Sequence, residues 1–134
     1  MSAINDRQLV EAALEGSKHA YIPYSNYRVG AALLTASGDV YTGCNVENAG
    51  YSPTICAERT ALVKAISEGQ QHFASIAVVS RGAGSPCGVC RQFMFEFAPD
   101  LKVILADLDG QVQLTTTLAE LLPHGFGPAN LDER

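Results

Sequence analysis

The sequence predicts an α/β protein, namely a three-layer α/β/α sandwich with a mixed five-stranded sheet. Five short apolar or alternating segments have the pattern of strands, and three longer segments have the spacing of amphipathic helices. Two strands come first and helices then alternate with strands, an order that favours one sheet between helical layers. The 134 residues, of which 47% are hydrophobic, are enough for one packed core, so residues 1–134 are expected to form a single domain.

The first half of the chain is expected to hold a helix and a β-hairpin. Apolar residues recur at helical spacing from Asp6 onward, and Pro23 with its turn-forming neighbours ends this pattern near Ala20. Residues 28–36 and 40–46 have the composition of strands, and the sequence Ser-Gly-Asp between them is typical of a turn.

The second half alternates helices with strands. The segments 75–80 and 102–107 are short, apolar and β-branched, as expected for strands that are covered on both faces. The expected elements, in order, are helix 56–67, strand 75–80, helix 87–97, strand 102–107, strand 112–116 and a short helix 118–122. The tail from residue 124 to 134 contains two glycines and a proline and is expected to be irregular.

Composition argues against several kinds of partner. Lys and Arg number 9 against 14 Asp and Glu, a net charge of −5, so a nucleic acid would be repelled. No apolar run approaches the roughly 20 residues of a membrane-spanning helix, and the N-terminal residues lack the apolar core of a signal peptide. We therefore expect a cytoplasmic protein with a small ligand, whose cysteines are thiols or metal ligands.

Three cysteines have the spacing of a metal site. Pro53 shortly precedes Cys56 and Pro86 directly precedes Cys87, which places both cysteines at the start of predicted helices, where free N–H groups favour a thiolate. Cys90 lies three residues after Cys87 on the same helical face. This pair can hold a zinc ion from two sides, and Cys56 supplies a third ligand if the two helix starts converge.

Glu58 decides what such a zinc ion would do. It follows Cys56 by two residues, so in the first turn of a helix both side chains can bend toward one metal. Three protein ligands leave a position for water, and a carboxylate beside it can carry a proton. Arg59 and Arg91 are placed to offset the charge of three thiolates, and we expect Arg59 to donate a hydrogen bond to a ligand sulfur.

Other interpretations of the cysteines remain. In the simplest interpretation, the three cysteines are buried free thiols. In a second interpretation, Cys87 and Cys90 form a redox dithiol, and this interpretation leaves Cys56 and Glu58 without a role. Cys44 as a fourth ligand would close the zinc site and make the chain a structural-zinc interaction module.

The chain resembles the cytidine deaminases, specifically the small homotetrameric, zinc-dependent type that acts on pyrimidine nucleosides. The stretches "GCNVENAGYSPTICAERTA" and "SPCGVCRQ" carry the two signatures of that family, and "YIPYSNYRVGAALLT" and "ELLPHGFGPANL" extend the resemblance over nearly the whole chain. Tyr27 stands where relatives often have Phe. The resemblance implies a cytidine deaminase-like fold and the conversion of cytidine and 2′-deoxycytidine to uridine and 2′-deoxyuridine plus ammonia, in pyrimidine salvage.

The resemblance also implies a role for the residues around the cysteines. Cys56, Cys87 and Cys90 are the expected zinc ligands, with Zn²⁺ as the cofactor. Glu58 is the expected catalytic residue, which takes a proton from activated water, delivers it to N3 of cytosine and protonates the departing amine. Arg59 is the expected support of a ligand sulfur.

Substrate contacts are implied at five positions, namely Asn45, Glu47, Tyr27, Ala57 and Phe126. The first two are expected to bind the ribose, and as they lie two apart at the end of a predicted strand, they share one face. Tyr27 is expected to pack on the pyrimidine. The resemblance places Phe126 in the pocket of a neighbouring subunit, so it implies a homotetramer with shared sites. A deaminase of a modified cytosine nucleoside, of the blasticidin type, is the nearest alternative enzyme.

Overall fold

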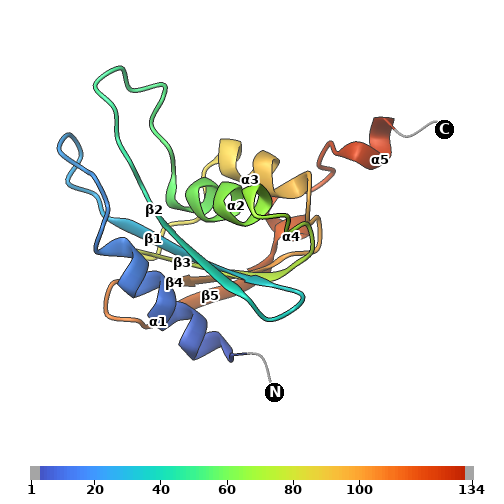
Figure 1. Ribbon diagram of the computed structural model, residues 1–134, viewed down its shortest axis with the longest axis horizontal. Helices are drawn as coiled ribbons and strands as arrows, with labels where there is room; N and C mark the ends of the chain where they lie inside the picture. Colours follow the sequence, from blue (N-terminus) through green and yellow to red (C-terminus); the bar gives the residue numbers. More distant parts are fainter. Residues whose placement is uncertain (1–3, 132–134) are drawn as a thin grey trace.

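The computed structural model describes residues 4–131, which contain five helices and five strands (Figure 1). The five strands form one sheet. The elements, in order, are α1 (Asp6–Ser17), β1 (Val29–Thr35), β2 (Val40–Cys44), α2 (Ala57–Ser67), β3 (Phe73–Ser80), α3 (Gly88–Phe95), β4 (Lys102–Ala106), β5 (Val112–Thr117), α4 (Leu118–Leu121) and α5 (Pro128–Leu131). Among these residues no helix is both long and apolar enough to cross a membrane.

The sheet is mixed, as predicted. Its strand order is β2-β1-β3-β4-β5, in which β3 and β4 pair parallel and the other neighbours pair antiparallel. The parallel pair requires a crossover, and α3 lies on that connection. The predicted hairpin is the antiparallel pair β1–β2, joined by the turn at Ser37 to Asp39.

Helices cover both faces of the sheet, which confirms the three-layer α/β/α sandwich (Figure 1). On one face α1 buries Leu9, Val10 and Ala13 against alternate residues of β1, β3 and β4. On the other face α2 and α3 bury Leu62 and Met94, among others, against the remaining residues of the same strands. The central strands are therefore apolar on both faces, which explains their lack of hydrophobic alternation.

Close backbone packing sets the position of α2. Gly43 in β2 faces the first turn of this helix, and a Cβ atom there would lie 2.5 Å from the carbonyl oxygen of Ala57 and 2.5 Å from the amide nitrogen of Ala61. Only a residue without a side chain permits this approach. The start of α2 consequently lies directly against the sheet.

Most predicted boundaries agree with the structure within three residues, and two predictions need correction. Val46 lies beyond β2 and forms isolated bridges with Tyr21 and Ile55 instead of extending the strand. The tail was predicted to be irregular, yet Pro128–Leu131 form the short helix α5, in which a proline is tolerated because it stands in the first turn. The last part of that prediction, residues 132–134, lies outside the described residues.

Candidate active site

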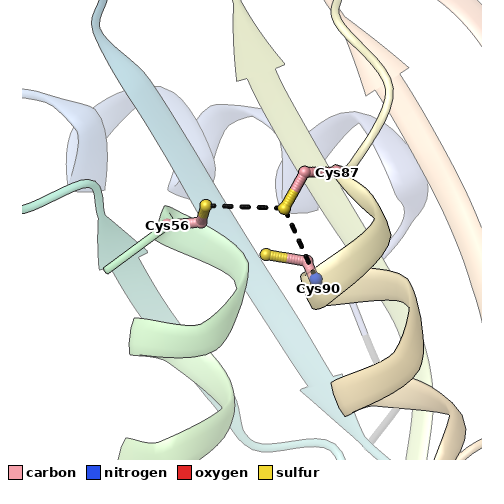
Figure 2. A group of neighbouring side chains, drawn as sticks. All are labelled: Cys56, Cys87 and Cys90. Carbon is pink, nitrogen blue, oxygen red and sulfur yellow. Dashed lines mark hydrogen bonds between the residues drawn. The ribbon is translucent and has the colours of Figure 1, made fainter. Parts of the chain in front are cut away.

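The first residues of α2 and α3 meet above one end of the sheet. Cys56 is the N-cap of α2 and Cys87 is the N-cap of α3, and both have extended backbone angles. Figure 2 shows the three cysteines in the space between these two helix starts, Cys56 from α2 and the other two from α3. The sequence predicted Cys56 and Cys87 as the first residues of their helices, and the structure places each one position earlier, as the N-cap. The sulfur of Cys87 accepts a hydrogen bond from the N–H of Cys90 at 3.4 Å, whereas the side chain of Cys56 makes no such capping bond.

The sulfur atoms have the geometry of a site for one zinc ion. The Sγ atoms of Cys56, Cys87 and Cys90 lie within 4.8 Å of one another, and those of Cys56 and Cys87 are 3.8 Å apart. Sulfurs bonded to one tetrahedral zinc ion at about 2.3 Å would be roughly 3.8 Å apart. Cys44, at the end of β2, is not a member of this group. Among the described residues the group thus offers three ligand atoms, the number that leaves one tetrahedral position open.

The surroundings shift the pKa values of two of these thiols in opposite directions. The pKa of Cys56 is lowered to about 5, mainly by a hydrogen bond from Cys90 and to a smaller extent by Arg59 and Cys87, against the opposing effect of burial. The same hydrogen bond, together with burial, raises the pKa of Cys90. Cys56 is therefore the sulfur that this environment stabilises as a thiolate.

Arg59 lies against the cysteine group, as the sequence predicted. Its Nη2 donates to Cys56 Sγ at 3.6 Å and to the carbonyl oxygen of Thr54 at 3.3 Å. A guanidinium in this position offsets part of the negative charge on the sulfur.

Arg91 has a different role from the one predicted. Its guanidinium donates to the carbonyl oxygen of Pro86 at 2.7 Å, to Ser85 Oγ at 2.8 Å and to the carbonyl oxygen of Leu121 at 2.6 Å. These bonds connect the loop before Cys87 with α4. Arg91 therefore supports the cysteine group through the backbone that carries it.

Glu58 is buried beside the cysteines. It is the second residue of α2, and only 4% of its surface is exposed. Burial is the main reason why its pKa rises to about 7, and the charge of Cys56 adds to this effect. A carboxyl group that is removed from bulk water and flanks a cavity can exchange a proton with a bound molecule.

A cavity of about 280 Å³ opens in front of these groups. It brings together most of the residues that were predicted to act on a substrate. Its lining includes Tyr27, Asn45, Glu47, Cys56, Ala57, Glu58 and Cys87. Val29 and Val78 add an apolar surface, so the cavity combines a few polar groups with an apolar floor, as small-molecule sites commonly do.

Asn45 and Glu47 are both held in place by backbone hydrogen bonds. Asn45 accepts from the N–H of Val29 at 3.0 Å and donates to the carbonyl oxygen of Tyr27 at 2.8 Å. Its amide thus keeps one N–H and one acceptor position for a ligand. Glu47 accepts from the N–H groups of Tyr24 at 3.0 Å and Ser25 at 3.2 Å.

Ser25 is a residue of this site that the sequence did not reveal. Its Oγ donates to Glu47 Oε2, and this hydrogen bond is the largest of the causes that lower the pKa of Glu47. Ser25 also lines the cavity. A serine that follows Pro-Tyr in an irregular segment has no pattern that marks a partner 22 residues away, so no sequence signal was available.

Phe126 is the predicted substrate contact that this chain does not bring to its own cavity. Its side chain is 55% exposed, and its carbonyl oxygen accepts a hydrogen bond from Gln92 at 2.8 Å. The cavity lining does not include it. Gln92, whose role the sequence left open, holds the turn that carries Phe126.

Comparisons with known proteins agree with this geometry. Residues 3–106 match the family described as the cytidine and deoxycytidylate deaminase zinc-binding region. A cytidine deaminase of Halalkalibacterium halodurans is 48% identical, over 96% of this chain and 99% of its own length. A cytidine deaminase of Sporosarcina psychrophila is 46% identical, over 92% and 93%. The crystal structure of a cytidine deaminase from Burkholderia pseudomallei has a TM-score of 0.87 and 48% identity, and covers 92% of this chain and 100% of that one.

Proposed function

The chain belongs to the family of zinc-dependent cytidine deaminases, and from this premise we propose which of its residues carry out the deamination of cytidine. The observation that carries the proposal is a group of three cysteine sulfurs, two of whose residues line one cavity together with the buried carboxyl group of Glu58. Two helix starts supply all four groups, which fixes their positions relative to one another.

Cys56, Cys87 and Cys90 would hold the zinc ion. Their mutual distances fit one tetrahedral ion, and three protein ligands are typical of a catalytic rather than a closed structural site. Zinc, when bound, supplies Lewis-acid activation of water at neutral pH. Arg59 supports the sulfur of Cys56 by donating a hydrogen bond to it.

Glu58 would be the proton carrier of the reaction. It accepts a proton from the attacking water and delivers it to N3 of the cytosine ring, which makes C4 a better electrophile. When the water oxygen has bonded to C4, Glu58 takes the remaining proton of the new hydroxyl and gives it to the amino group as the C4–N bond breaks, so that C4 keeps a carbonyl oxygen, ammonia leaves and uridine remains. Its burial in the wall of the cavity excludes bulk water, which would otherwise compete for the proton.

The nucleoside itself would be bound by the opposite wall. Asn45 and Glu47 offer free hydrogen-bonding positions to the ribose, and since both cytidine and 2′-deoxycytidine carry a 3′-hydroxyl, we expect both to be substrates. Tyr27 packs on the pyrimidine, and Ala57 forms the cavity wall beside Glu58. Phe126, which is exposed here, closes the pocket of a neighbouring subunit in a homotetramer.

The wider setting of the enzyme is part of the same proposal. Residues 1–134 act as one deaminase domain in the cytoplasm, where the reaction returns cytosine nucleosides to the uridine pool in pyrimidine salvage.

The test is to incubate the purified protein with cytidine, with and without a zinc chelator, and to follow uridine. The proposal predicts uridine and ammonia in equal amounts, loss of activity with the chelator and recovery with added Zn²⁺. A protein that contains zinc but forms no uridine would contradict it and would favour a structural-zinc module instead.

A further inference from the structure

The loop between β3 and α3 forms one wall of the cavity without regular secondary structure of its own. Residues 81–86 precede Cys87, and Gly84 and Ser85 line the cavity. Ala83 has a φ of 52°, a left-handed backbone conformation that a residue with a side chain adopts only when neighbours hold it there. The contacts that fix this loop therefore matter for the shape of the cavity.

Tyr27 provides a contact from a distant part of the chain. Its hydroxyl donates to the carbonyl oxygen of Arg81 at 2.9 Å, across 54 residues of sequence. The guanidinium of Arg81 lies over the Tyr27 ring, 5.2 Å from its centroid. Gly84 packs against the same hydroxyl, because a Cβ atom there would lie 3.2 Å from the Tyr27 oxygen. One phenolic oxygen thus bonds to Arg81 and occupies the space that a side chain at position 84 would need.

The other side of Tyr27 is joined to the wall that carries the polar groups. Its N–H donates to Ser25 Oγ at 3.0 Å, and its carbonyl oxygen accepts from Asn45 Nδ2 at 2.8 Å. Ser25 in turn donates to Glu47. The backbone of Tyr27 is therefore bonded to Ser25 and Asn45, and its hydroxyl is bonded to the loop 81–86.

From these contacts we infer that Tyr27 is a positioning residue that sets the width of the substrate cavity. The hydroxyl, which donates to the backbone of the loop 81–86, holds this loop at a fixed distance from Asn45 and Glu47. Without it, the loop opens more often and the nucleoside loses part of its enclosure. This inference takes the identity of the ligand from the proposed function. The hydrogen bond between Tyr27 and Arg81 does not depend on that function.

Trypsin reports on this contact directly. Arg81 is exposed, and the peptide bond that trypsin would cut after it contains the carbonyl group that accepts from Tyr27. Cleavage of a folded protein at such a bond tracks the population of the locally open form. A neutral hydrogen bond contributes about 0.5–1.5 kcal/mol, so Tyr27→Phe should accelerate cleavage at Arg81 about two- to tenfold.

The matched control is Tyr41→Phe. The hydroxyl of Tyr41 also donates a hydrogen bond, to Glu68 at 3.4 Å, and Tyr41 does not line the cavity. Tyr27→Phe keeps the ring under Arg81 in place, so the comparison isolates the hydroxyl. Cleavage is measured by mass spectrometry on the intact zinc-loaded protein, and cleavage after Lys18 serves as the internal reference.

Kinetics supply the second readout. We expect Tyr27→Phe to raise KM for cytidine about two- to tenfold while kcat changes less than about twofold. The inference would be overturned if Tyr27→Phe left either the rate of cleavage at Arg81 or the KM for cytidine within about 1.5-fold of the wild-type value. It would also be overturned if Tyr41→Phe had an effect equal to that of Tyr27→Phe. If the wild type forms no uridine, the proposed function fails, and the cleavage rates alone then decide whether the contact holds the loop.

Discussion

Arg59 donates a hydrogen bond from Nη2 to Cys56 Sγ across 3.6 Å, so a guanidinium lies against one sulfur of the proposed zinc site. Three thiolates around one Zn²⁺ carry an excess of negative charge, and a cation at this distance offsets part of it. The bond also lowers the pKa of Cys56, which favours the form of the thiol that binds metal.

Arg59→Ala should therefore weaken zinc binding by about 10- to 100-fold, the usual effect of losing a partner that orients a metal ligand. The measurement is competition with a chromophoric chelator. Arg59→Lys, which keeps the charge but lacks the planar fork, should fall between the wild type and the alanine variant. An alanine variant that binds zinc as tightly as the wild type would show that Arg59 does not support the site.

Ser25→Ala should raise KM for cytidine about two- to tenfold, because Glu47 loses the hydroxyl that orients its carboxylate. Ser67→Ala is the matched control, since that hydroxyl donates only to the backbone within α2 and lies away from the cavity. Equal KM values for both variants would mean that Ser25 does not act on Glu47.

The same variant makes a prediction about pH. Hydrogen bonds from Ser25 and Tyr24 hold the pKa of Glu47 below its ordinary value, so in the wild type the carboxylate stays ionised to a lower pH. Removing the hydroxyl raises that pKa. KM should consequently start to rise at a higher pH in Ser25→Ala than in the wild type as the solution is acidified. Measuring KM across about pH 4 to 7 tests this shift, and coincident profiles would contradict it.

Gly43→Ala should lower the free energy of unfolding by about 1–3 kcal/mol, as overpacking does, because the new methyl group would lie 2.5 Å from backbone atoms of α2. Activity should fall as well, since α2 carries Glu58. Gly88→Ala is the control, because no heavy atom lies within 4 Å of its added Cβ. Urea denaturation measures the free energy of unfolding of both variants. Equal denaturation midpoints would show that β2 and α2 can move apart without loss of stability.

Zinc content separates an open site from a closed one. Cys44→Ala should retain one zinc ion per chain, because Cys44 is not in the sulfur group, whereas Cys87→Ala should lose most of it. Elemental analysis of the purified variants measures this directly. Loss of zinc from Cys44→Ala would indicate a fourth ligand and a structural site.

The sequence was sufficient for the parts of the site that lie on local patterns. Prolines before Cys56 and Cys87 mark the helix starts, and the two-residue spacing predicted one shared side for Asn45 and Glu47, which both line the cavity although β2 ends before them. In each case the information lies within a few residues, in turn chemistry or in the spacing of neighbouring side chains.

The remaining parts depend on contacts between distant segments. The hydrogen bond from Tyr27 to Arg81 joins residues that are 54 positions apart in the sequence, and the loop after Arg81 has left-handed backbone angles. No periodic sequence pattern encodes such a contact. The roles of Ser25 and Arg91 are likewise set by which loops the sheet brings together. The helix α5 was missed because a four-residue helix leaves too short a pattern to detect.

The central claim is that the buried carboxyl group of Glu58 carries protons beside a zinc ion held by three sulfurs. Glu58→Gln keeps the shape of the side chain and removes its ability to transfer a proton. Measured on protein with one zinc ion per chain, kcat for the conversion of cytidine to uridine should fall by about 10²- to 10⁴-fold. A Glu58→Gln variant that retains zinc and deaminates cytidine within about tenfold of the wild-type rate would contradict the claim.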